Sequence, residues 1–145
     1  MMQNFFISII FILTPLSAAW ANSDCIKGIG KVDMCAKARS LSNEIASMLP
    51  MQMSQNMSWE SVMAAGSTIQ AHIRLSYDKN HLESAIKQAG VPLSNVKQAI
   101  QKSARNVCLE NTPTRAFIDL GGSFKYIYSY IDGNQFMTAS VSKCN

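Results

Sequence analysis

The sequence of 145 residues predicts an α+β domain, in which a four-stranded antiparallel sheet packs against three to four helices on one face. Two pairs of alternating stretches, 59–65 with 68–77 and 123–131 with 135–142, are each joined by turn residues and predict two hairpins. Apolar residues before and between the hairpins recur at helical spacing. Four cysteines in the same part of the chain predict two disulfide bonds.

The start of the chain is typical of a secretory signal peptide. An apolar run at 5–13, in which only Ser8 is polar, is followed by small residues that precede a cut after Ala21. A membrane-spanning helix would need about 20 apolar residues, although an uncleaved anchor stays the alternative because no Lys or Arg precedes the run. We expect a signal peptide at 1–21 and a single domain at 22–145, periplasmic or secreted, with no stable membrane anchor.

The cysteines are expected to be oxidised in an exported chain. Several pairings are possible. We favour Cys25 with Cys35, because the pair is local, and Cys108 with Cys144, because that bond joins a helix end to the last strand. A zinc site is the weaker alternative, since no close CxxC pair occurs.

The first half of the domain is predicted to contain a helix and a hairpin. The helix covers 34–49, with Asp33 as its N-cap and Pro50 at its end, and an extended link follows at 51–57. The hairpin turns at Gly66. In its first strand, alternation places Trp59, Ser61 and Met63 opposite Glu60, Val62 and Ala64. In its second strand, one face carries Ile69, Ala71, Ile73, Leu75 and Tyr77.

The second half is predicted to contain two amphipathic helices, a short helix and the second hairpin. The first helix follows a cap at Asp78 or Asn80, and the next runs from Pro92 to Cys108. Pro113 suits the first turn of a short helix at 114–120, capped by Asn111 or Thr112 and left through Gly121 and Gly122. Strand 123–131 is apolar enough on both faces to be central, and an Asp132-Gly133-Asn134 turn leads into its partner.

Composition argues against several classes of function. The net charge of +4 is spread over helix faces while the aromatics lie in strands, which favours a solvated surface over a nucleic-acid site. The only histidines, His72 and His81, lie near no hydrolase motif, and no Gly-rich phosphate loop occurs. We therefore predict no catalytic residue and no cofactor.

Two groups of residues are candidates for partner binding. Met51, Met53 and Met57 are soft and adaptable, so packing, partner contact and a Cu(I) site are all open, with packing favoured and no metal site predicted. Tyr126 and Tyr128 belong to a row with Tyr130 that lies either in the core or on a partner-binding face, and the core is favoured.

Arg115 is the third candidate. A cation at the start of a helix is unfavourable to the helix dipole, so we expect it to have a partner elsewhere. An intramolecular ion pair with Asp119 or Glu110 is favoured, and ligand binding is the alternative.

Several of these features together resemble the type II secretion pilotins of the AspS type and the quorum-sensing-regulated virulence factor family. The residues that carry the resemblance are Leu49-Pro50 at the helix end, Gly66 in the hairpin, and the block Cys108, Pro113, Arg115, Gly121, Tyr126, Tyr128, Asp132, Gly133 and Cys144. The resemblance implies a disulfide between the matching cysteines and a groove that holds a helix from the C-terminal end of the secretin subunit. The chain departs from it by lacking the lipidation cysteine and by adding Cys25 and Cys35.

The resulting hypothesis is a non-enzymatic, pilotin-like accessory protein that binds an apolar helix or strand of a secretin or another envelope protein. An exported virulence or defence effector that inhibits an enzyme is the alternative, followed by a methionine-rich copper-binding protein.

Overall fold

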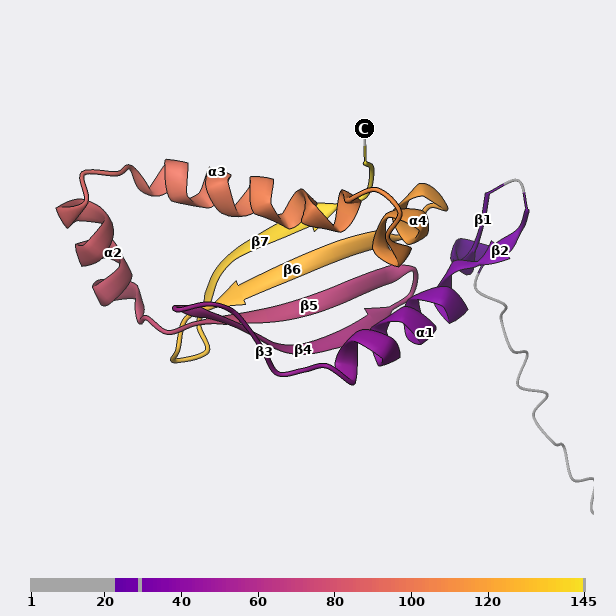
Figure 1. Cartoon of the computed structure of the whole chain (residues 1–145), viewed down its shortest axis with the longest axis horizontal. Coiled ribbons are helices and arrows are strands. Elements are labelled where there is room, and N and C mark those ends of the chain that lie inside the picture. Colours follow the sequence, from indigo (N-terminus) through magenta and orange to yellow (C-terminus); the bar gives the residue numbers. More distant parts are fainter. Residues whose placement is uncertain (1–22, 29, 145) are drawn as a thin grey trace, which may run out of the picture.

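The computed structural model of the chain describes residues 23–28 and 30–144 and confirms an α+β domain. Its main sheet has five strands in the order β3 (Met51–Ser54), β4 (Met57–Ala65), β5 (Thr68–Leu75), β6 (Ser123–Ser129) and β7 (Gln135–Val141) (Figure 1). All neighbours are antiparallel except β5 and β6, which are parallel. The predicted four-stranded antiparallel sheet is therefore wrong in strand number and in one pairing. The signal peptide predicted at 1–21 lies outside the described residues.

The parallel pair follows from the long connection between the two hairpins. Between β5 and β6 the chain forms α2 (Lys79–Gln88), α3 (Leu93–Ala104), the 3₁₀ helix η2 (Arg105–Cys108) and α4 (Pro113–Asp119). A crossover of this length returns the chain to the end where β5 began, so β6 enters in the same direction. The hairpins themselves are confirmed, because short turns join β4 to β5 and β6 to β7.

Strand β4 contains an irregularity that changes which side chains face the helices. Its register with β5 shifts between Trp59 and Ser61, so an extra residue is inserted at Glu60. Trp59 consequently lies with Val62 and Ala64 against the core, and the predicted alternation across this strand is wrong at Trp59. A one-residue insertion has this effect because side chains alternate with a period of two.

The helices cover one face of the sheet. Helix α1 (Met34–Ala46) packs on β4 and β5, α3 packs on β7, and α4 contacts α1 and β6 (Figure 1). The predicted N-cap of α1 is confirmed, since the Asp33 carboxylate accepts the Ala36 N–H at 2.9 Å. Before α1, a small hairpin of β1 (Ile26–Lys27) and β2 (Val32–Asp33) follows the 3₁₀ helix η1 (Ser23–Cys25).

The core lies between the helices and the covered face of the three strands β5 to β7. Its buried members are Met34, Ala38, Ile45, Ile69, Ala71, Ile73, Ala104, Val107, Phe117, Ile118, Phe124, Tyr126, Tyr128, Ala139 and Val141. Both predicted disulfides are present, with Cys25 joined to Cys35 and Cys108 joined to Cys144. The two bonds link the end of η1 to α1 and the end of η2 to the chain after β7.

Candidate protein-binding surface

A shallow groove runs along α3, and we call it the α3 groove. It has a volume of about 410 Å³ and is lined by Val91, Asn95, Val96, Ala99, Ile100 and Ser103. On a helix, residues three and four apart lie on the same face, so Val96, Ala99, Ile100 and Ser103 form one continuous stripe. Ala99 and Ser103 are small, which lets another element approach the helix axis closely.

The contacts of α3 determine which way the groove faces. Gln101 Nε2 donates to the Ser140 carbonyl at 3.3 Å, and Lys97 Nζ lies 5.6 Å from the centre of the Phe136 ring. Because β7 is the edge strand, these two residues mark the outer side of α3. Ile100 packs against the core, and the rest of the stripe follows it around the helix. The α3 groove therefore lies on the side of α3 that is turned away from these two contacts with β7.

The middle of the sheet carries an aromatic cluster formed by Trp59, Tyr126 and Tyr128, which we call the aromatic floor. No helix crosses the centre of β5 and β6 between α1 and α3 (Figure 1). The Trp59 and Tyr126 rings meet edge to face at 6.3 Å, and the Tyr126 and Tyr128 ring centres are 6.4 Å apart. The register places Tyr126 between Ala71 and Ala139, so its neighbours on both sides are small.

The tyrosines of the aromatic floor are deeply packed, as the favoured interpretation predicted. Tyr126 is 5 % exposed and Tyr128 3 %. Burial raises the pKa of both phenols, and the neighbouring Tyr128 adds to the effect on Tyr126. Both hydroxyls therefore stay protonated at neutral pH and can donate hydrogen bonds.

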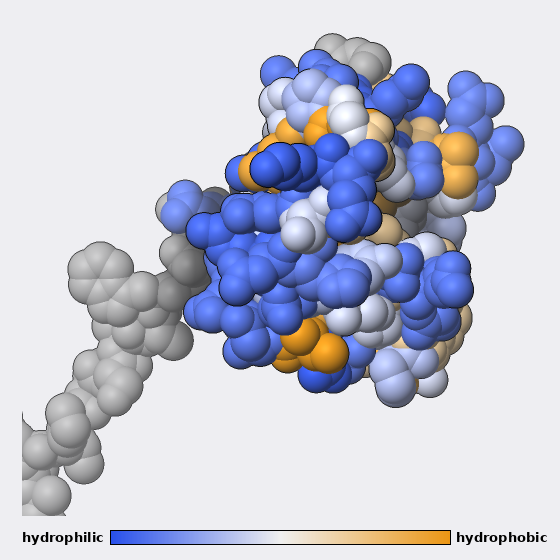
Figure 2. Space-filling model, turned by 90° about the vertical axis from the view of Figure 1, so that its left-hand side faces the viewer, coloured by the Kyte–Doolittle hydropathy of each residue, from blue (hydrophilic) through white to orange (hydrophobic). Residues whose placement is uncertain are grey.

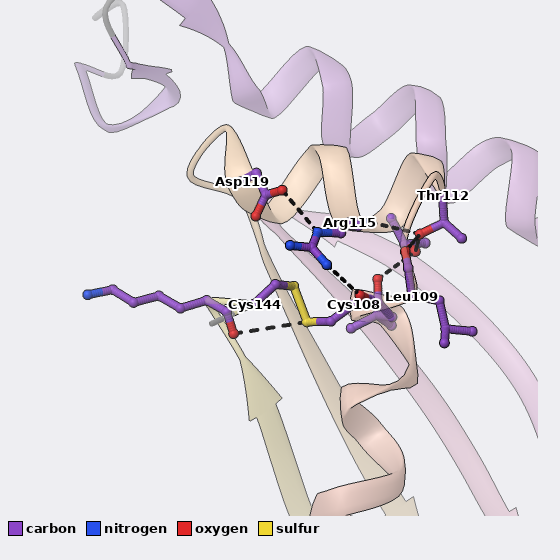
Figure 3. The surroundings of a disulfide bond; sticks show 9 residues. Cys108, Leu109, Thr112, Arg115, Asp119 and Cys144 are labelled. Carbon is purple, nitrogen blue, oxygen red and sulfur yellow. Dashed lines mark hydrogen bonds and ion pairs between the residues drawn. A yellow bond between two sulfur atoms is a disulfide. The ribbon is translucent and has the colours of Figure 1, made fainter.

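Arg115 takes the intramolecular role that was favoured from the sequence. Its Nε lies 3.3 Å from the Asp119 carboxylate, and its Nη1 donates to the Cys108 carbonyl at 3.2 Å (Figure 3). The Thr112 hydroxyl accepts the Arg115 N–H, which confirms Thr112 as the cap of α4. These bonds, together with the disulfide to Cys144, hold the end of η2 against α4 and the chain after β7 (Figure 3).

The methionine run lies elsewhere, at the opposite edge of the sheet. Residues 51–57 do not form the predicted extended link, because Met51 and Met53 belong to the edge strand β3. Both side chains are exposed, whereas Met57 lies on β4 and packs partly against the core. The structure thus separates the methionines, on β3 and β4, from Arg115 on α4.

The α3 groove was missed by the sequence reasoning. The sequence predicted an amphipathic helix from Pro92 to Cys108, but it did not predict that Ala99 and Ser103 would form an open surface beside Val96 and Ile100.

The remaining surface is mostly polar. Viewed from the end at which α2 lies, the molecule is largely hydrophilic, with small separate apolar patches (Figure 2). A second hollow of about 270 Å³ lies between α1 and α4 and includes both Lys37 and Glu44 in its lining. Among the described residues, no helix has the length and apolar character needed to cross a membrane.

The fold of the chain is similar to that of two solved type II secretion pilotins, so the resemblance seen in the sequence extends to the structure. The pilotin AspS of Vibrio cholerae matches with a TM-score of 0.56 at 19 % identity, over 76 % of this chain and 89 % of that chain. The type 2 secretion pilotin EpsS of Vibrio vulnificus matches with a TM-score of 0.58 at 11 % identity, over 77 % and 92 %.

A third solved structure has the same fold. A Pseudomonas aeruginosa protein assigned as secreted matches with a TM-score of 0.59 at 14 % identity, over 81 % of this chain and 98 % of that chain. No family model and no curated protein matches the sequence. At these identities the likeness is one of fold.

Proposed function

We propose that the chain is an exported, non-enzymatic accessory protein of an envelope secretion system, which binds an apolar helix of a protein partner between α1 and α3. The observation that carries the proposal is the apolar stripe along α3, which no other element of the described chain lines. The fold shared with two pilotins supports the assignment to secretion, and the two disulfides support export.

A helix suits this surface better than a strand. Strands β4, β5 and β6 are each paired on both sides, so the middle of the sheet offers no free main-chain edge to an incoming strand. A helix satisfies its own main-chain hydrogen bonds and needs only an apolar face to dock. The small side chains of Ala99 and Ser103 allow such a helix to pack closely along α3.

A pair of arginine substitutions tests the position of the site. Ala99→Arg places a long cation in the α3 groove, whereas Gln98→Arg places the same side chain on the next, exposed residue outside its lining. We expect only Ala99→Arg to abolish partner binding, and both variants to keep the unfolding midpoint of the wild type. Equal binding by the two variants would place the site elsewhere.

The partner is tested by affinity purification from an envelope extract, with Ala99→Arg as the matched negative. The resemblance to pilotins leads us to expect the secretin subunit, bound through its C-terminal helix. Recovery of a hydrolase whose activity falls on binding would instead support the inhibitor function. A secretin recovered equally with wild type and Ala99→Arg would contradict the groove assignment.

A further inference from the structure

The hollow between α1 and α4 is bounded by two matching stripes of residues. Its volume is about 270 Å³, and we call it the α1–α4 hollow. The stripe on α1 consists of Lys37, Ser40 and Glu44, and the stripe on α4 and its C-cap of Pro113, Ala116 and Leu120. Both stripes have the spacing i, i+3 and i+7, which keeps three residues on one face of a helix over two turns, or about 10 Å.

The middle residue of each stripe is small. Ser40 on α1 and Ala116 on α4 are also exposed, so they leave room between the two helices. The lining is completed by two apolar side chains, because Leu41 is half-buried and Phe117 is buried. A large apolar side chain of a partner can therefore pack between Ser40 and Ala116, against an apolar floor.

The two walls of the α1–α4 hollow differ in charge. The wall on α4 has no charged residue, and its Leu120 is 40 % exposed. The wall on α1 carries Lys37 at one end and Glu44 at the other, about 10 Å apart along the helix axis. Neither of these side chains forms an ion pair with another described residue. Both charges are therefore available to a partner.

A third helix is the element that fits these walls. Helices satisfy their main-chain hydrogen bonds internally, so α1 and α4 offer no free edge to an extended strand. A helix laid along α1 has the same pitch, so two of its residues seven positions apart come opposite Lys37 and Glu44. Charge complementarity requires the residue opposite Lys37 to be acidic and the residue opposite Glu44 to be basic.

We propose that the α1–α4 hollow is a second docking site, for an amphipathic helix with an acidic and a basic residue seven positions apart and a large apolar residue between them. The hollow shares no lining residue with the α3 groove, so the inference stands apart from the proposed function. A protein with both sites can hold two helical segments at once.

The position of the site is tested with a synthetic amphipathic helix that carries Glu and Lys seven residues apart, with Leu between them. Ala116→Arg places a long cation in the hollow, and Ala99→Arg, the same change in the α3 groove, is the matched control. We expect Ala116→Arg to abolish binding and Ala99→Arg to leave it unchanged, while both variants keep the unfolding midpoint of the wild type. The opposite result, or no binding to the wild type, would overturn the proposal.

The charge requirement is tested with a second peptide that has Lys at both positions. The wild type should bind the Glu and Lys peptide about two- to fivefold more tightly than the second, and Lys37→Glu should invert this preference. Arg39→Glu is the control, because it makes the same change of charge on α1 outside the lining and should keep the wild-type preference. Both preferences should disappear in about 1 M salt. A preference unchanged by Lys37→Glu, or inverted equally by Arg39→Glu, would refute the assignment.

Discussion

We predict that removal of the Cys108–Cys144 disulfide destabilises the protein more than removal of the Cys25–Cys35 disulfide does. The bond joins the end of η2 to the chain after β7, across a sequence separation of 36 residues. It therefore ties α3, which carries the groove, to the strand on which α3 packs. The perturbation is Cys108→Ser with Cys144→Ser, and the reference is the same change at Cys25 and Cys35.

The magnitude follows from the entropy of the closed loops in the unfolded chain. For the long loop the loss is about 4 kcal/mol, and for the loop between Cys25 and Cys35, with a separation of 10, it is about 3 kcal/mol. Small domains have total stabilities of about 5 to 15 kcal/mol. The variant should thus remain folded at room temperature, because the expected loss is smaller than the usual total stability of a small domain.

The assay is equilibrium unfolding in urea without reductant, with both double variants and the wild type measured side by side. Partner binding by the Cys108 and Cys144 variant should fall only in proportion to its unfolded fraction. A loss below about 1 kcal/mol, or a larger loss at Cys25 and Cys35, would refute the reasoning, because loop length would then not control the effect.

Two further predictions concern alkaline pH and the mature N-terminus. Burial raises the pKa of Tyr126 above the usual 10.0, so above that pH the unfolded chain loses a proton that the folded chain keeps, and the free energy of unfolding of the wild type falls as the pH rises. The stability that Tyr126→Phe loses relative to the wild type, measured by urea unfolding, should therefore be smaller at about pH 11 than at about pH 8. Mass spectrometry of the exported protein should find a chain that begins at Asn22. An intact Met1 or a diacylglyceryl group on Cys25 would contradict this.

The features that the sequence predicted correctly depend on local chemistry. Asp33, Asp78 and Thr112 cap helices because their side chains accept main-chain N–H groups three residues on. The turn at Asp132 formed because its carboxylate accepts the Asn134 N–H at 3.0 Å. Each of these depends on a few adjacent residues and is readable without knowing the rest of the fold.

The errors concern contacts between distant segments. Strand β3 is exposed at all of its residues, so it has no buried face to produce alternation, and only its pairing with β4 makes it a strand. The insertion at Glu60 breaks alternation within β4, and nothing local signals it. The α3 groove also could not be predicted, because the sequence pattern of an apolar helix face is the same whether a strand of this chain or a partner covers that face.

The link from α4 into β6 gives a final test of how tightly the core is built. Gly121 adopts φ +99° and donates to the Ile118 carbonyl at 2.8 Å, and Gly122 donates to the Phe117 carbonyl at 3.0 Å. This is a Schellman motif, which satisfies the last carbonyls of the helix. A Cβ on Gly122 would lie 2.7 Å from Cδ1 of Phe117 and closer still to two other atoms of the ring.

The ring cannot easily move away, because Phe117 is buried and meets Phe124 edge to face at 5.9 Å. Gly122→Ala should therefore cost about 1 to 3 kcal/mol through overpacking. If the ring is the cause, Phe117→Leu should remove part of that cost, and the double variant should be more stable than the sum of the singles by about 1 kcal/mol. Gly121→Ala is the control, because its cost comes from positive φ and should add to that of Phe117→Leu without coupling. Simple additivity at Gly122 would mean that the backbone, and not the ring, requires glycine there.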